Sequence, residues 1–114
     1  MELVEEINAQ LRHVTILERM EFLSELEVGH SSLALELVDD ASRPTKRILL
    51  VASDISGLEL RDFCGFTQLC CLQVADVRRQ QHDRVRYTIE DLEHRRIRLR
   101  CDGISLRQLA PISR

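Results

Sequence analysis

The sequence has 114 residues, of which 44% are hydrophobic and 31% charged, with 4 Gly and 2 Pro, so fibrous and disordered chains are excluded. No apolar run approaches the roughly 20 residues that span a bilayer, and the acidic start, Met1-Glu2-Leu3-Val4-Glu5-Glu6, differs from the basic start of a signal peptide. We therefore expect one compact cytoplasmic domain over residues 1–114, without a membrane segment.

The formal net charge of -3 combines two halves of opposite sign. Residues 1–60 hold 12 acids and 5 bases, whereas residues 61–114 hold 7 acids and 11 bases, all of them Arg. Such halves either attract each other within the fold or serve two different surfaces.

The N-terminal residues 2–12 are predicted to form a helix, because Leu3, Val4, Ile7 and Leu11 recur at helical spacing. The next stretch, residues 14–23, fits either a second helical stripe or a strand. We favour a helix or an irregular turn there.

Beyond residue 24 the apolar period changes to two, which is typical of strands. A hairpin is expected first, with a turn at Gly29–Ser32, and Asp102-Gly103 signals a tight turn near the end. The expected strands are, in chain order, 24–28, 33–37, 48–52, 58–60, 69–77, 84–90, 96–101 and 104–106. Strands joined by short turns predict an α+β fold, in which the N-terminal helix packs on a mainly antiparallel β-meander sheet or a small sandwich.

The strands 84–90 and 96–101 carry the most distinctive pattern in the chain. If Ile89 lies opposite Ile97, the apolar side chains of both strands share one face, and a shift by two residues keeps the same faces. The other face, which we call the arginine face, then holds Arg84, Arg86, Arg96, Arg98 and Arg100.

Neighbouring guanidinium groups repel one another, so the arginine face requires neutralisation. The protein's own acids are one source, either on the Glu2, Glu5 and Glu6 helix or on the Glu25, Glu27 and Glu36 hairpin. An acidic protein partner is the second source, and a substrate anion is another. Nucleic acid is the less favoured partner, because the chain is acidic overall and has few aromatic residues for base stacking.

The four cysteines, Cys64, Cys70, Cys71 and Cys101, lack the paired spacing of a structural zinc site. We expect reduced, packed thiols and no metal or cofactor; a redox pair, or an irregular metal site with His82 or His94, is the alternative. Asp91 and Glu93 beside His94, and the pair His82-Asp83, are interpreted as solvated turns.

Catalytic motifs such as GxSxG, HExxH and the phosphate-binding glycine loops do not occur in the sequence. Our leading hypothesis is a non-enzymatic protein-interaction module of the adaptor or toxin-neutralising type, which binds one protein through the arginine face or the acidic N-terminal half. The alternative is a small-ligand, metal or thiol site built from the Cys and His residues. Pairing of exposed sheet edges into a homodimer is a third possibility.

Overall fold

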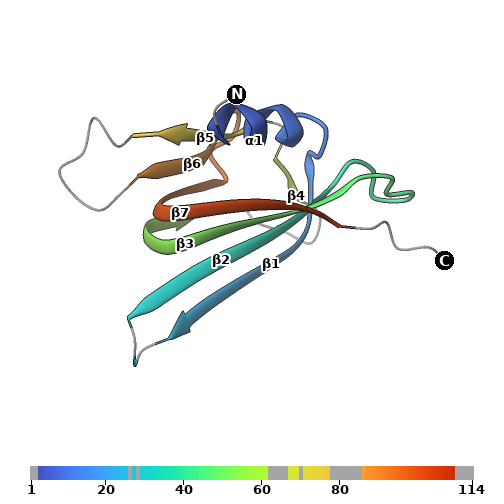
Figure 1. Cartoon of the computed structure of the whole chain (residues 1–114). Helices are drawn as coiled ribbons and strands as arrows, with labels where there is room; N and C mark the ends of the chain where they lie inside the picture. The colour runs from blue at the N-terminus through green and yellow to red at the C-terminus, as the bar shows by residue number, and fades with distance from the viewer. Residues whose placement is uncertain are drawn as a thin grey trace.

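The computed structural model describes residues 3–25, 27, 29–61, 67–69, 71–77 and 86–109. Their elements are α1 (Leu3–Leu11), β1 (Ile16–Glu25), β2 (His30–Val38), β3 (Arg47–Leu60), β4 (Thr67–Gln68), β5 (Leu72–Asp76), β6 (Tyr87–Asp91) and β7 (Ile97–Leu109). Figure 1 shows α1 above a curved sheet, with the β1–β2 hairpin extending away from the helix.

The helix α1 confirms the prediction for residues 2–12. Its apolar stripe buries Ile7 and Leu11 against the sheet, while Glu5 and Glu6 are exposed in the first turn, where the helix dipole favours acids. The polar Asn8 lies among these apolar positions and bonds to β5: its side-chain amide donates to the carbonyl of Val74 and accepts from the Val74 amide, both at 2.8 Å.

The favoured helix or irregular turn at residues 14–23 is wrong, because β1 occupies Ile16–Glu25. The predicted hairpin exists, but its first strand is β1, and β2 already begins at His30, inside the expected turn. Pairing of β1 with β2 along nearly their whole lengths outweighs the local helical spacing of Ile16, Leu17 and Met20.

The strands β3 and β7 are long and bent. The expected strands 48–52 and 58–60 are joined into β3, with Asp54 (φ 55°) and Gly57 (φ 63°) in the left-handed region where the strand bends. The predicted tight turn at Asp102-Gly103 is wrong, because β7 runs through it and Gly103 pairs with Ser53.

The strand order is β4-β1-β2-β3-β7-β6-β5, and each pair of neighbouring strands is antiparallel. The α+β class and the antiparallel sheet are confirmed, whereas a simple meander is not, because β3 pairs with β7 rather than with its successor. The edge strands β4 and β5 are separated by only residues 69–71, so the sheet curls until its edges approach each other. Arg96 closes this curve by donating from Nη1 to the carbonyl of Gln68, at 3.2 Å.

The core fills the inside of the curved sheet and is closed by α1. Leu37, Leu50, Ile89, Ile97 and Leu99 are each 0% exposed. In β3, Ile48, Leu50 and Ala52 point into this core, while Leu49 and Val51 are only half-buried on the outer face, so this strand is not buried equally on both faces.

Candidate partner-binding surface

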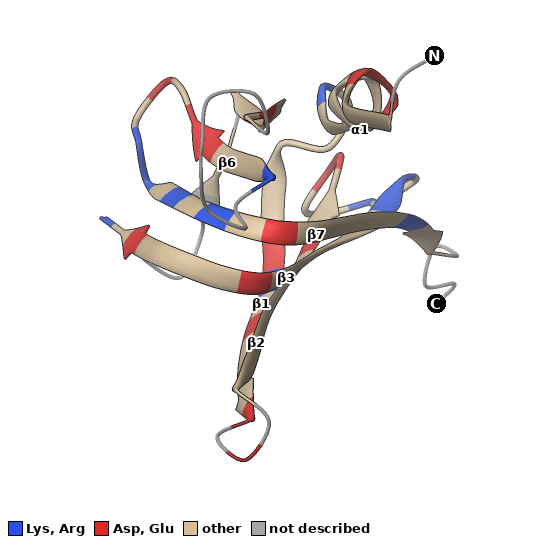
Figure 2. Cartoon of the chain, turned by 60° about the vertical axis from the view of Figure 1, so that its left-hand side comes forward, with Lys and Arg blue, Asp and Glu red and all other residues tan. Residues whose placement is uncertain are grey.

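The inner and outer faces of β6 and β7 are as predicted, in a register shifted by two residues. Ile89 lies opposite Leu99, and Tyr87 lies opposite Cys101, with all four side chains buried. Arg98 and Arg100 are exposed on the outer face of β7. Figure 2 shows basic segments in the first half of this strand.

The other members of the predicted arginine face have separate environments. Arg86 is exposed just before β6, with its guanidinium carbon 5.8 Å from the centre of the Tyr87 ring, within the range of a cation–π contact. Arg96 is half-buried and tied to Gln68, whereas Arg84 lies outside the described residues. Of the five predicted members, Arg86, Arg98 and Arg100 are therefore the ones that are exposed in the described residues.

Acids flank Arg98 but not Arg100 in the neighbouring strands. Glu59 of β3 and Glu90 of β6 lie opposite Arg98, whereas Ser56 and Thr88 lie opposite Arg100. No carboxylate among the described residues forms an ion pair with Arg98 or Arg100.

Glu5, Glu6 and Glu36, which were expected to neutralise this face, lie in other parts of the structure. The helix α1 packs on the inner side of the sheet, so Glu5 and Glu6 are separated from Arg98 by the core. Glu36 binds Arg47 instead. The arginine face is therefore left with the two flanking acids of its own sheet.

A shallow groove follows the bend of β3 beside Arg100. It has a volume of about 420 Å³ and is lined by Gly57, Glu59, Glu90, Arg98 and Arg100, among others. A Cβ at Gly57 would lie 3.0 Å from Nη2 of Arg100, so the absence of a side chain lets the guanidinium lie across the strand. Guanidinium groups held at the side of such a groove can bind carboxylates through paired hydrogen bonds.

A second charged cluster was not predicted from the sequence. Arg47, at the start of β3, is only 6% exposed and donates to Glu18 at 2.5 Å and to Glu36 at 2.7 Å. The bond to Glu36 raises the pKa of Arg47 above its ordinary value. This triad joins three adjacent strands and serves the fold, because its cation is buried and already paired.

An exposed ion pair lies at the other end of β2. Nδ1 of His30 is 2.8 Å from Oδ1 of Asp54, and this hydrogen bond, together with the charge of Asp54, raises the pKa of His30 above 6.5. Ser31 cannot serve as a nucleophile for this pair, because its hydroxyl already bonds to both backbone groups of Ile55. The pair connects the hairpin to the bend of β3.

Replacing Asp54 by Asn should lower the pKa of His30 toward 6.5, measured by NMR titration of the His30 ring. Asn tolerates the left-handed backbone at this position, so the charge is removed without added strain. A raised pKa stabilises the fold below pH 6.5, and that contribution disappears as pH rises through the folded-state pKa of His30. The stability difference between wild type and variant should follow the same course, and an unchanged His30 titration would contradict the assignment.

The cysteine and histidine residues are the candidates for the alternative metal or thiol site. No group of three potential ligands gathers within the part of the chain that the structure describes. Burial raises the pKa of Cys101 to about 12, which suppresses its thiolate, and Cys71 donates to Glu93 at 3.7 Å. Cys64, Cys70, His82 and Asp83 lie outside the described residues.

Among the residues that the structure describes, no helix is long and apolar enough to cross a bilayer.

Comparison with known proteins adds a separate line of evidence. No curated protein and no solved structure matches the chain. A family model described as immunity protein PIM8, however, matches residues 2–106, nearly the whole sequence. The chain therefore belongs to the immunity protein PIM8 family.

Proposed function

We propose that this protein neutralises a toxin by binding it directly, and that Arg86, Arg98 and Arg100 contact an acidic surface of that toxin. Membership of an immunity-protein family carries the first part, since an immunity protein acts on a partner toxin. This family membership agrees with the toxin-neutralising form of the interaction module that we predict from the sequence.

The exposed arginines support the second part. Arg98 and Arg100 extend from the outer face of a strand that is paired on both sides, so the backbone that carries them is rigid. Acidic residues lie opposite Arg98, whereas no carboxylate lies opposite Arg100 in either neighbouring strand. A carboxylate from a partner would complete this pattern, and exposed Arg is enriched at protein interfaces.

The cytoplasm is the compartment that we propose for this protein. Cys101 is a buried, free thiol, which fits a reducing environment. The nucleic-acid alternative receives less support, because Tyr87, beside the arginine face, is only 7% exposed and offers no open ring for a base.

Reversing both charges, Arg98→Glu with Arg100→Glu, should raise the dissociation constant for the toxin by about a hundredfold or more. The toxin for this test is identified first, as one against which coexpression of the wild-type chain protects cells. Its affinity for the purified chain is then measured by calorimetry. Arg107→Glu is the matched control for each single reversal, Arg98→Glu or Arg100→Glu, since it makes the same charge change in the other half of β7, where Arg107 pairs with Leu49 and is exposed.

The two parts of the proposal can fail separately. A chain that protects against none of the toxins of its source cell would contradict toxin neutralisation itself. Wild-type affinity in the doubly reversed variant would contradict only the assignment of the arginine face.

A further inference from the structure

The edges of the sheet are unequally protected. On β5, the side chain of Asn8 occupies both backbone groups of Val74, in the way that a neighbouring strand would. On β1, the two-residue β4 covers Ile16 and Leu17. From Arg19 to Glu25, no strand of the described residues pairs with the outer edge of β1.

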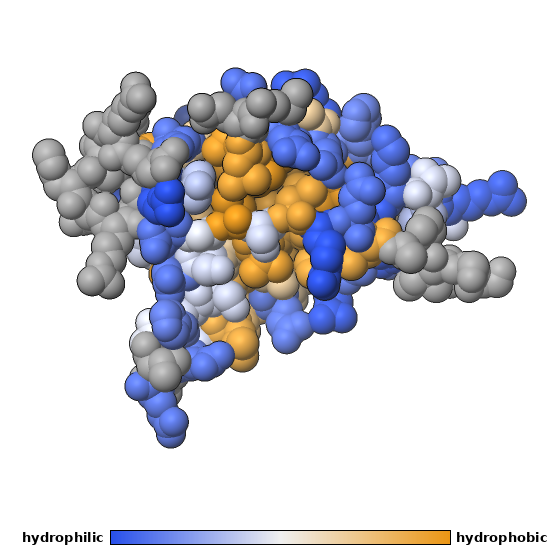
Figure 3. All heavy atoms as spheres, viewed as in Figure 1, coloured by the Kyte–Doolittle hydropathy of each residue, from blue (hydrophilic) through white to orange (hydrophobic). Residues whose placement is uncertain are grey.

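This open edge also carries exposed apolar side chains. Phe22 is 52% exposed and Leu23 is 51% exposed, and they point to opposite faces of the sheet. Figures 1 and 2 both show the β1–β2 hairpin standing clear of the rest of the molecule. Figure 3 shows an apolar spot on this hairpin among hydrophilic surroundings.

The charges along this edge are complementary to a second copy of the same edge. If two β1 strands pair in antiparallel fashion with Phe22 opposite Phe22, then Arg19 of each strand lies opposite Glu25 of the other. Met20 then faces Ser24, and Glu21 faces Leu23. Opposite charges and aromatic pairs at directly opposed positions stabilise antiparallel strands.

Neighbouring registers lack this complementarity. A twofold axis perpendicular to the sheet preserves its faces, so the alternatives differ by steps of two residues. A shift of one strand by two residues in one direction places Glu21 opposite Glu21. The same shift in the other direction places Glu21 of each strand opposite Glu25 of the other. Like charges at opposed positions destabilise a sheet.

We propose that two copies of this chain form a symmetric dimer through the Arg19–Glu25 edge of β1, with Phe22 at the twofold axis. The sheets of the two copies then become one continuous antiparallel sheet. This pairing provides partners for the open backbone groups and covers both Phe22 side chains at once. It does not depend on toxin binding, because the arginine face lies on β6 and β7.

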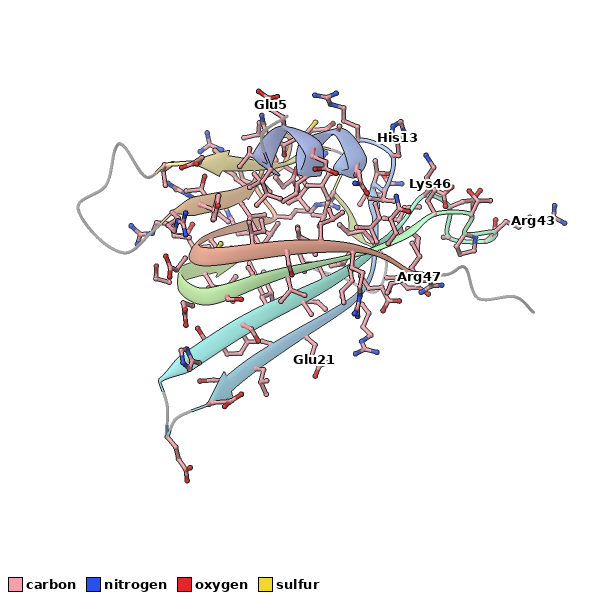
Figure 4. The ribbon with its side chains drawn as sticks, viewed as in Figure 1. Glu5, His13, Glu21, Arg43, Lys46 and Arg47 are labelled. Carbon is pink, nitrogen blue, oxygen red and sulfur yellow. The ribbon has the colours of Figure 1, made fainter. Side chains whose placement is uncertain are left out.

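The test is sedimentation velocity over a concentration series, in which wild type should reach about twice the 13.2 kDa of one chain. Arg19→Glu alone, or Glu25→Arg alone, should raise the dimer dissociation constant about tenfold to a hundredfold, because each creates two like-charge pairs. Arg19→Glu combined with Glu25→Arg should restore dimerisation. Arg43→Glu is the control, since Arg43 lies in the loop after β2, away from the hairpin tip (Figure 4).

The register is tested by isotope-filtered NMR on a mixture of labelled and unlabelled chains. Contacts between the Phe22 rings of two copies, and between Arg19 and Glu25, are expected. A monomer at every concentration, or a dimer that the double charge exchange fails to restore, would overturn the proposal. The proposal would also be overturned if this edge were protected from hydrogen exchange only when the toxin is bound, because the toxin would then be the partner of β1.

Discussion

Replacing Leu50 by Ala should lower the free energy of unfolding by about 3 kcal/mol, measured by urea denaturation. Leu50 is 0% exposed and lies in β3, between Leu35 of β2 and Leu106 of β7. Its truncation leaves a cavity where the two halves of the sheet share a core, and the paired strands on either side restrict collapse into that space.

The control for Leu50 is the same truncation at an exposed position. Leu92 is 54% exposed in the turn after β6, so Leu92→Ala should change stability by less than about 0.5 kcal/mol. Equal losses at the two positions would contradict the core described here.

Replacing Arg47 by Met should cost about 3 kcal/mol, because it leaves the carboxylates of Glu18 and Glu36 without their shared cation. Glu36 has only 17% of its side chain exposed and cannot easily become solvated, whereas Glu18, at 40%, can turn toward water. Most of the penalty therefore arises at Glu36.

A double-mutant cycle tests this interpretation. Glu36→Leu combined with Arg47→Met replaces the buried pair by apolar side chains and should recover at least about 1 kcal/mol of the loss seen with Arg47→Met alone. Urea unfolding of the four proteins gives the coupling energy. Strictly additive losses would show that Glu36 and Arg47 do not stabilise each other.

The faces of β6 and β7 could be predicted from the sequence because alternation requires only a period of two. The register could not be predicted, because it depends on the turn at residues 92–96, in which Arg95 adopts a left-handed backbone (φ 52°). The same limit applies to Glu59. Its position opposite Arg98 results from the pairing of β3 with β7, which no local pattern reveals.

The errors at β1 and at Asp102-Gly103 have a common cause. Ile16, Leu17 and Met20 happen to follow helical spacing, and Asp-Gly favours a turn, but pairing with distant strands outweighs both local preferences. Asn8 did give a usable signal, since a polar residue within an apolar helical stripe requires a partner inside the fold. The identity of that partner, the backbone of Val74, depends on how the helix packs on the sheet.

The central place of β7 has a consequence for how the chain acquires its structure. Among the described strands, β7 is synthesised last. It lies between β3 and β6 and joins β1–β2–β3 to β5–β6. Its pairing with β3 brings together Arg47 and Leu109, which are 62 positions apart in the sequence. During synthesis the earlier strands can form hairpins, but the shared core cannot close until β7 has left the ribosome. Until then the inner faces of both halves remain uncovered, so assembly of this fold depends on its last long-range step.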